Sequence, residues 1–307
     1  DDSFDTATLT ITPTGANDSP GVLVPDTGDN LKVVDQDALA TRKGGEPAGT
    51  DEAADGNSAD NDDPTETVTG SFTFSGGDGA TTITIQGSGA PVAVPLAGPF
   101  TPIVGDYGTL TITSIVGNTV NYSYTLADNI DHSDATPDQD DFTIVVDDSD
   151  GSNADAASDV LTIHITDDAP IADDDTDVID EGDLTETGNV ITRPNTTSGA
   201  AGDDRVGADD AEITAVTGPG GTSMDGDDFM VVGQWGSLRI SPDGEYTYTL
   251  SPAGTAALNA LGAGQTLAAE VFTYTLTDSD DSFDTATLTI TPTGANDNPG
   301  LLVPDTG

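Results

Sequence analysis

The chain has 307 residues with 56 acidic and 6 basic side chains, and its formal net charge at pH 7 is −50. Nucleic acid and anionic membrane surfaces are excluded as partners, because both are bound through Lys and Arg. The chain has no cysteine, which excludes disulfides and thiol chemistry, and no apolar run approaches the roughly 20 residues that span a bilayer.

Apolar and polar residues alternate with period two along most of the chain, in runs rich in Thr, Val, Ile and Tyr. This pattern predicts half-buried antiparallel strands, and Gly, Asp, Asn and Pro separate them. In chain order the predicted strands cover residues 8–12, 71–74, 82–85, 121–126, 142–146, 161–165, 238–240, 246–250, 272–276 and 288–290. Residues 251–261 fit a short helix or a loop. Short strands at this spacing predict an all-β fold of antiparallel β-sandwiches.

The same alternation predicts which side chains fill the cores. In the first half of the chain these are Phe72, Phe74, Ile83, Ile85, Leu110, Ile112, Tyr122, Tyr124, Phe142, Ile144, Leu161, Ile163 and Ile165. In the second half they are Val190, Ile213, Val216, Trp235, Leu238, Ile240, Tyr246, Tyr248, Phe272, Tyr274, Leu288 and Ile290. We interpret Trp235 as a core anchor rather than as a residue that stacks on a ligand.

Residues 280–307 repeat residues 1–28 with two differences, Ser19/Asn298 and Val22/Leu301. A fixed offset of 279 residues indicates a tandem array of near-identical units. A weaker repeat lies inside each unit, because residues 107–112 align with 235–240, 122–126 with 246–250, and 142–150 with 272–280. Each unit is therefore predicted to hold two related sandwiches.

These repeats set the predicted domain boundaries. Residues 1–18 are the terminal strand of a preceding repeat, 19–168 the first sandwich, 169–297 the second, and 298–307 the start of the next repeat. We expect the terminal strand to be mobile or to pair with an exposed sheet edge. Residues 40–67, which include the acidic stretch 42–64, are predicted to form a long loop that is flexible or pinned by ions.

The clustering of the acids favours bound Ca²⁺, because like charges packed without a cation repel one another. Ca²⁺ takes six to eight oxygen ligands from carboxylates, carbonyls and Asn side chains. The alternatives are a solvated acidic surface and, for an isolated Asp, a turn former. At the junction of the two sandwiches the candidate ligands are Asp147, Asp148, Asp150, Asp167, Asp168, Asp173, Asp174, Asp175 and Glu181. At the end of the second sandwich they are Asp278, Asp280, Asp281, Asn296 and Asp297, and at the N-terminal copy Asn17 and Asp18 with Asp35 and Asp37.

Several motifs resemble those of giant bacterial RTX adhesins. The first domain resembles their type I secretion target repeat, through VVDQD at 33–37, TGSFTF at 69–74, GTLTI at 108–112, YSYTL at 122–126 and DNIDH at 128–132. The second resembles VCBS or cadherin-like repeats, through DEGD at 180–183, GEYTYTL at 244–250 and residues 272–281. The acidic stretch 42–64 is longer than the first repeat type has.

The resemblance implies tandem Ig-like and cadherin-like sandwiches joined by acidic calcium-binding linkers. It implies a structural extender, rigidified by Ca²⁺ at the domain junctions, that projects a ligand-binding tip from the bacterial cell surface for adhesion or biofilm formation. We expect an extracellular monomer whose partners are the neighbouring repeats of the same chain.

Catalysis is not expected. The two histidines, His132 and His164, have no nucleophile at a recognisable spacing, and the chain has no Gly-x-Ser-x-Gly elbow or phosphate-binding loop. The alternative function is binding, in which Thr-rich strands such as residues 8–12 form an ice- or glycan-binding face. Outward Thr on a solvated strand also follows from β-propensity alone.

Overall fold

The structure is a computed structural model, and it describes residues 18–25, 32–40, 47–50, 65–77, 81–130, 132, 138–148, 156–192, 195–198 and 202–295. Its contacts divide the chain into two compact units. Unit 1 consists of Asp1–Lys32, Val68–Thr125 and Gln139–His164, and unit 2 consists of Val33–Thr67, Leu126–Asp138 and Ile165–Gly307. The boundaries drawn from the repeats differ from this division and stay a prediction.

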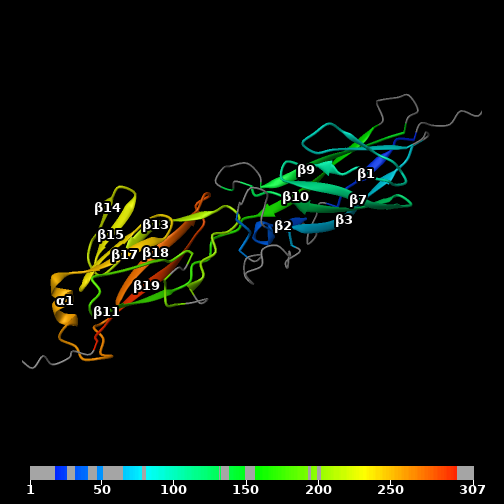
Figure 1. Ribbon diagram of the computed structural model, residues 1–307. Helices are drawn as coiled ribbons and strands as arrows, with labels where there is room; N and C mark the ends of the chain where they lie inside the picture. Colours follow the sequence, from blue (N-terminus) through cyan, green and yellow to red (C-terminus); the bar gives the residue numbers. More distant parts are fainter. Residues whose placement is uncertain are drawn as a thin grey trace, which may run out of the picture. The chain divides into compact units, whose positions relative to one another are not determined.

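The first sandwich consists of two sheets (Figure 1). One sheet has the order β1-β3-β8-β7-β6, with β1 Gly21–Leu23, β3 Thr67–Ser75, β8 Thr119–Leu126, β7 Gly108–Val116 and β6 Ile103–Val104. The other has the order β2-β10-β9-β4-β5, with β2 Val33–Asp35, β10 Ala157–Thr166, β9 Gln139–Asp147, β4 Thr82–Gln86 and β5 Val92–Val94. A 3-10 turn, η1 Gln36–Ala38, follows β2.

The second sandwich, in unit 2, also consists of two sheets. One has the order β11-β19-β18-β13, with β11 Asp175–Asp180, β19 Phe283–Thr293, β18 Glu270–Asp278 and β13 Ala211–Thr217. The other has the order β12-β17-β16-β15-β14, with β12 Thr185–Asn189, β17 Glu245–Leu250, β16 Gly236–Ile240, β15 Asp228–Val232 and β14 Thr222–Asp225. The β11–β19 pair is parallel, whereas β18 pairs with β19 and with β13 in antiparallel register. The all-β prediction is confirmed.

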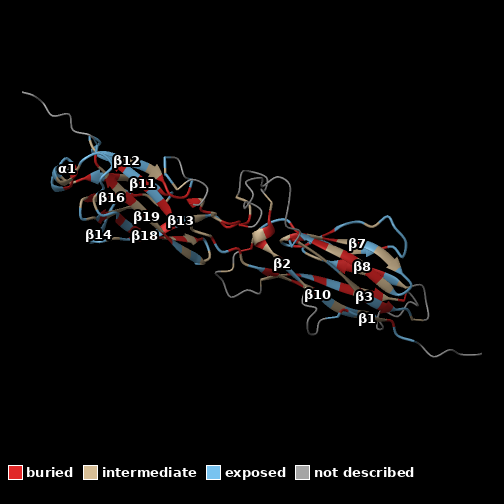
Figure 2. Cartoon of the chain, turned by 90° about the horizontal axis from the view of Figure 1, so that it is seen from below, coloured by how far each residue is buried: buried red, intermediate tan, exposed pale blue. Residues whose placement is uncertain are grey.

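Period-two alternation builds both cores, as the alternating buried and exposed residues along the strands of Figure 2 show. All the side chains predicted for the first core are buried, and so are those predicted for the second core with one exception. The exception is Trp235, which is half-buried, packs against the core from outside and donates its indole N–H to the Ala268 carbonyl at 3.1 Å. Trp235 thus covers the core rather than anchoring it.

The predicted helical segment forms a helix over part of its length, α1 at Pro252–Leu258. Ser251 caps it by accepting a hydrogen bond from the Gly254 N–H at 3.0 Å, and Pro252 occupies the first turn, where its missing N–H has no cost. Within the described part of the chain, no helix is long and apolar enough to cross a membrane.

A buried acid holds the same position in both sandwiches. Asp140 at the start of β9 is 1% exposed and accepts hydrogen bonds from the Tyr124 hydroxyl at 2.6 Å and from backbone amides of the turn that leads into β7. Glu270 at the start of β18 is 2% exposed and accepts from the Tyr248 hydroxyl and, again, from backbone amides of a turn. The weak internal repeat therefore corresponds to a shared structural device.

Candidate functional site

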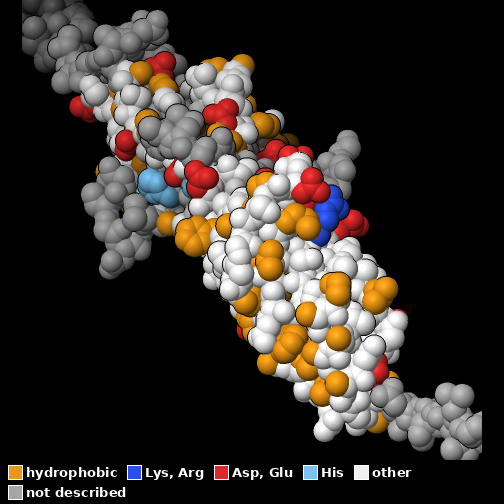
Figure 3. Space-filling model, turned by 90° about the vertical axis from the view of Figure 1, so that its left-hand side faces the viewer, with side chains coloured by type: hydrophobic (Ala, Val, Ile, Leu, Met, Phe, Trp, Pro, Cys, Tyr) orange, Lys and Arg blue, Asp and Glu red, His pale blue; other side chains and the backbone are white. Residues whose placement is uncertain are grey.

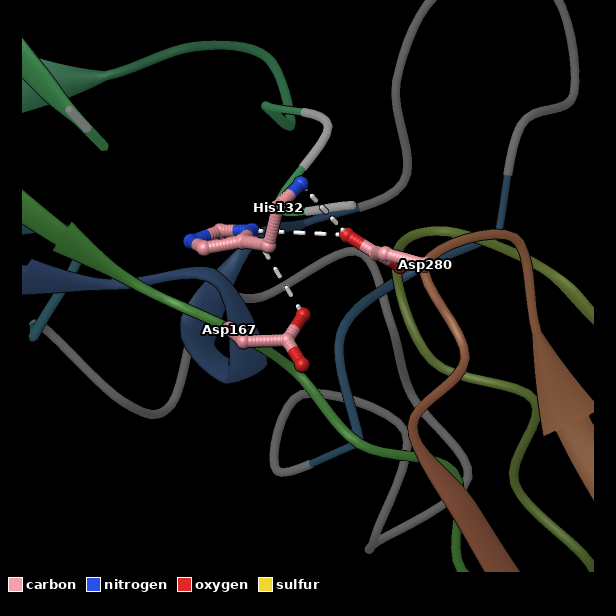
Figure 4. Close-up of side chains that lie close together, drawn as sticks. All are labelled: His132, Asp167 and Asp280. Atoms are coloured by element: carbon pink, nitrogen blue, oxygen red, sulfur yellow. Dashed lines mark hydrogen bonds and ion pairs between the residues drawn. The ribbon is translucent and has the colours of Figure 1, made fainter. Parts of the chain in front are cut away.

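Three titratable side chains of unit 2 meet between the loop after β8, the segment after β10 and the β18–β19 hairpin (Figure 4). His132 Nδ1 lies 3.4 Å from Asp280 Oδ2 and 3.6 Å from Asp167 Oδ1, and the His132 backbone N–H donates to Asp280 Oδ2 at 2.8 Å. The Asp280 side chain is 0% exposed and that of His132 is 12% exposed. These stretches are distant in sequence and converge on one buried charge cluster.

Hydrogen bonds within the β18–β19 turn orient Asp280 toward the cluster. Strand β18 ends at Asp278, whose carboxylate accepts hydrogen bonds from the backbone N–H groups of Asp280 at 3.2 Å and Ser282 at 2.9 Å. Asp281 turns the hairpin with φ 71°, a left-handed conformation that Asp tolerates better than most residues. Ser282 then donates its hydroxyl to Asp167 Oδ2 at 2.5 Å, which holds the segment after β10 against the hairpin.

The cluster contains buried carboxylate oxygens that have no hydrogen-bond donor in the described part of the chain. They are Asp138 Oδ1, Asp167 Oδ1, Asp278 Oδ2 and Asp280 Oδ1. A buried anionic oxygen without a partner is costly, so an arrangement of this kind requires positive charge nearby. The cluster is therefore a candidate cation site.

His132 supplies part of that positive charge. Its Nδ1 lies 3.1 Å from the Ile130 carbonyl and its Nε2 lies 3.3 Å from the Ile165 carbonyl. Both ring nitrogens face acceptors, and only the doubly protonated ring donates to both. Burial lowers the His132 pKa, but the Ile165 carbonyl and the neighbouring carboxylates raise it more, so that it lies above its usual value.

The charges of the carboxylates disturb one another. Burial, followed by the charges of Asp280 and Asp167, raises the pKa of Asp278 from 3.8 to about 7. Asp278 is 8% exposed, so little solvent screens this repulsion. One imidazole ring thus faces four carboxyl groups in this cluster.

Asp168, beside the cluster, has a different environment. It is 1% exposed, and its carboxylate accepts hydrogen bonds from the Thr50 N–H at 3.0 Å, the Thr50 hydroxyl at 2.6 Å and the Ala208 N–H at 2.8 Å. Burial nevertheless raises its pKa, against the effect of these donors. Asp168 was predicted as a ligand, and the structure shows it fastening the described part of the long loop, at Thr50.

Asp209 is a second acid held by donors. It is 7% exposed, and it accepts hydrogen bonds from the Gln36 side-chain amide at 3.0 Å and from the Asn129 side-chain amide. Burial raises its pKa to about 6, and the Asn129 hydrogen bond opposes this shift. Asp209 therefore ties η1 and the loop after β8 to the loop before β13.

A further acidic group surrounds the start of β11. Asp204 accepts hydrogen bonds from the Asp173 N–H at 2.7 Å and the Tyr274 hydroxyl at 2.8 Å, and burial raises its pKa to about 7. Asp175, 0% exposed, accepts from the Ser198 hydroxyl. The predicted residues Asp173 and Asp175 thus join Asp204, which the sequence did not single out.

The structure corrects how the predicted residues were grouped. Asp147 is the last residue of β9 and Asp148 follows it, at the end of β9 that pairs with the start of β10, whereas Asp167 comes after the end of β10. Asp148 Oδ2 instead lies with the Asp18 carbonyl against Gly77 in unit 1. The antiparallel pairing therefore separates Asp147 and Asp148 from Asp167.

Two more groupings change. Asp18 lies in unit 1, whereas Asp35 and Asp37, at the end of β2 and in η1, lie in unit 2. Glu181 follows the far end of β11 from Asp175 and accepts the Ala295 N–H at 2.7 Å. The six residues of β11 extend about 20 Å, so Glu181 is separated from Asp175.

Some predicted positions are not described or belong elsewhere. Asn17, Asp150, Asn296 and Asp297 lie outside the described residues. Asp174 accepts hydrogen bonds from the Thr287 N–H and hydroxyl, both at 2.8 Å. Of the predicted ligands, Asp167, Asp278 and Asp280 are therefore the ones that the structure brings into one cluster.

Sequence reasoning missed Asp138, Asp204, Asp209 and the role of His132. The only available signals were the charged run at residues 202–210 and the placement of His132 in an acidic loop. Neither indicates which side chains face inward, because the loops lack the alternation that reveals buried positions in a strand.

The oxygen-rich cluster fits a hard divalent cation. Carboxylate oxygens without hydrogen-bond donors are the ligands that Ca²⁺ prefers, and the described cluster has neither sulfur nor a second histidine, which softer metals favour. Fold and site thus define a class: all-β proteins of antiparallel sandwiches with a buried carboxylate cluster suited to Ca²⁺.

The sequence comparison identifies the family. The chain is 30% identical over 200 residues to the calcium-binding lectin RapA2 of Rhizobium johnstonii, an alignment that covers 64% of this chain and 76% of the lectin. The chain belongs to the family of this lectin. No protein-family model matches the sequence.

Two solved structures also resemble the chain at low similarity. The CupB6 tip adhesin of Pseudomonas aeruginosa is 10% identical, with 76% of this chain and 91% of that chain covered and a TM-score of 0.30. Drosophila N-cadherin EC1-4 is 16% identical, with 71% and 42% covered and a TM-score of 0.25. These TM-scores are too low to support an argument.

Proposed function

We propose that the chain is a Ca²⁺-dependent structural segment of a bacterial surface adhesin. The observation that carries this proposal is the Asp280 carboxylate, which is 0% exposed and has an oxygen without a hydrogen-bond donor in the described part of the chain, beside buried oxygens of Asp138, Asp167 and Asp278 that likewise have no hydrogen-bond donor there. A chain with a net charge of −50 needs compensation at such a point.

The expected ligands are Asp138, Asp167, Asp278 and Asp280. They come from three separate stretches of unit 2, so one ion bound to them cross-links the loop after β8, the segment after β10 and the β18–β19 hairpin. Ca²⁺ supplies the positive charge, and the protein supplies a fixed set of oxygens. Binding to the folded state alone stabilises it by mass action.

The adhesin role rests on the family and the repeat. A relative named as a calcium-binding lectin supports Ca²⁺ binding and an extracellular setting for this chain. The 279-residue period supports a segment that recurs along an array rather than a single catalytic domain. Ca²⁺ would rigidify the domain junctions and so extend the array from the cell surface.

The test compares Asp280→Asn with Asp281→Asn in the full chain. Asp281 is adjacent and exposed, and Asn keeps its left-handed backbone conformation, so this variant is a matched control. After EGTA treatment, Ca²⁺ is titrated by calorimetry and by thermal unfolding. Free Ca²⁺ at a hundred times its Kd stabilises by about 2.7 kcal/mol per site.

Wild type and Asp281→Asn are expected to gain stability with Ca²⁺, and Asp280→Asn to bind fewer ions and to lose part of that gain. The same Ca²⁺ stoichiometry and the same gain in all three proteins would overturn the assignment of the site.

The second candidate function is carbohydrate binding, which the printed name of the RapA2 lectin favours. The two functions are compatible, because an extended segment can also carry a binding face. A saccharide that binds to the full chain would support this candidate, and the position of its site decides how the two functions relate.

A further inference from the structure

The outer face of the β12-β17-β16-β15 sheet carries a cavity of about 540 Å³, distinct from the carboxylate cluster. Thr187 lies opposite Thr247, and Thr247 lies opposite Arg239, so a row of polar side chains crosses three strands on this face. Asp228 and Glu245 also line the cavity. The cavity therefore lies on a regular sheet, and the strand register fixes which residues stand next to one another in it.

Among the described residues that line the cavity, Arg239 supplies a guanidinium in a fixed orientation. Arg239 Nη2 lies 2.5 Å from Asp228 Oδ2, and the Arg239 side chain is 53% exposed while that of Asp228 is 16% exposed. The carboxylate holds one edge of the planar fork and leaves its other N–H donors free for a ligand. On the face drawn in Figure 3, basic side chains show at one place only, beside acidic side chains. With 6 basic against 56 acidic residues, a guanidinium is a rare feature of this chain.

The lining decides the class of ligand. Among the described residues of the lining, the carboxylates of Asp228, Asp243 and Glu245 outnumber the Arg239 guanidinium, which disfavours phosphate, nucleic acid and acidic ligands. The lining is made of hydroxyl, amide and charged groups, which disfavours an apolar ligand. The lining matches a ligand with several adjacent hydroxyl groups. Its carboxylates can accept hydrogen bonds from the ligand hydroxyls, and its guanidinium and Thr hydroxyls can donate hydrogen bonds to the ligand oxygens.

We propose that this cavity binds a neutral saccharide. Arg239 donates to ring or hydroxyl oxygens of the sugar, Glu245 accepts from its hydroxyls, and Thr247 contacts it from the centre of the face. The assignment rests on carbohydrate binding as the second candidate function and places that function on a face away from the Asp280 cluster.

The first sandwich lacks the key residue. Residues 108–112 align with 236–240, so Thr111 stands where the second sandwich has Arg239. In the corresponding sheet of the first sandwich, β1 pairs with β3, whereas β12, which corresponds to β3, is the edge strand of its sheet. The proposed site therefore occurs once per 279-residue unit, and an array presents it repeatedly, which raises avidity without new contacts.

The test measures binding of neutral oligosaccharides of glucose, galactose and mannose to the full chain by saturation-transfer NMR and calorimetry. Arg239→Lys keeps the charge but loses the fork, and Thr247→Val keeps the shape but loses the hydroxyl. Thr249→Val is the matched control, because Thr249 is exposed on the same strand, two residues on and outside the cavity. Thermal unfolding confirms that each variant is folded.

We expect at least one oligosaccharide to bind, about tenfold or more weaker binding in Arg239→Lys, weaker binding in Thr247→Val and no change in Thr249→Val. Asp280→Asn is expected to keep saccharide binding, which separates this site from the cation site. The proposal is overturned if no oligosaccharide binds or if Arg239→Lys binds as wild type does. It is also overturned if the cavity takes only Ca²⁺, seen as a lower Ca²⁺ stoichiometry in Glu245→Gln without bound sugar.

Discussion

Two acids of unit 2 show how the surroundings of a carboxylate decide its role. The Asp168 carboxylate accepts three hydrogen bonds and fastens Thr50 and Ala208, whereas Asp280 has a buried oxygen for which the described residues offer no hydrogen-bond donor. Both were predicted as ligands from the same pattern of clustered acids. The sequence shows where acids are dense. Which carboxylate oxygens remain available for a cation depends on the conformation of the loop backbones, and loops have no sequence periodicity from which it could be predicted.

The raised pKa values predict how the Ca²⁺-free protein responds to pH. Asp278 titrates near pH 3.8 when unfolded and at about 7 when folded, so between these values the folded state binds a proton that the unfolded state lacks. Stability should therefore fall as pH rises through this window. His132 acts in the same direction, because its raised pKa gives stability that is lost as the ring deprotonates. In EGTA, urea unfolding should show higher stability at pH 5 than at pH 7.5.

Ca²⁺ should reverse this dependence, because the ion needs ionised carboxylates. Asp278→Asn is the control, and it should make the slope measured in EGTA shallower, because the raised pKa values of Asp204, Asp209 and His132 still contribute to it. A Ca²⁺-free protein whose stability rises from pH 5 to pH 7.5 would contradict this account of the cluster.

At the scale of elements, strand alternation predicted the cores well and the junctions poorly. The period of two places Phe142 and Ile144 inside, whichever loop comes after the strand. Which loops meet depends on strand direction instead, and antiparallel pairing of β9 with β10 puts Asp147 and Asp167 at opposite ends. Alternation predicts both strands but not how they pair, so the acids were grouped by their order in the sequence.

The buried acid shared by the two sandwiches gives a prediction for the strands that it joins. Tyr248→Phe leaves a buried oxygen of Glu270 without its hydroxyl donor, and Tyr124→Phe does the same to Asp140. Each change should destabilise its sandwich by about 1–3 kcal/mol in urea unfolding. Thr249→Val, on the exposed face of β17, should stay within about 0.5 kcal/mol of wild type. Equal stability of the Tyr variants and this control would mean that the acid is satisfied without the hydroxyl.

At the scale of the whole molecule, the two sandwiches have matching sheet orders, with β3-β8-β7-β6 in the first corresponding to β12-β17-β16-β15 in the second. Tyr124 and Tyr248, in aligned motifs, bond to acids at the same position of β9 and β18. The internal repeat was visible because strands keep their alternation through sequence change. The acid is Asp in one sandwich and Glu in the other, which is why the sequence alone did not reveal it.

The tandem period predicts how an array grows. In chains extended by one and two further 279-residue units, a rigid extender should lengthen by a constant increment per unit in Ca²⁺, because near-identical units would repeat the same proposed Ca²⁺-bound junction. In EGTA the buried carboxylates lose the proposed cation and repel one another. If this cation rigidifies the array, the dimensions should then grow more slowly than in proportion to length, as in flexible chains. Small-angle scattering of the series with and without Ca²⁺ measures both regimes. Asp280→Asn arrays in Ca²⁺ should behave as wild type does in EGTA, whereas Asp281→Asn arrays in Ca²⁺ should extend fully. Equal growth in every condition would show that Ca²⁺ at this cluster does not set the extension.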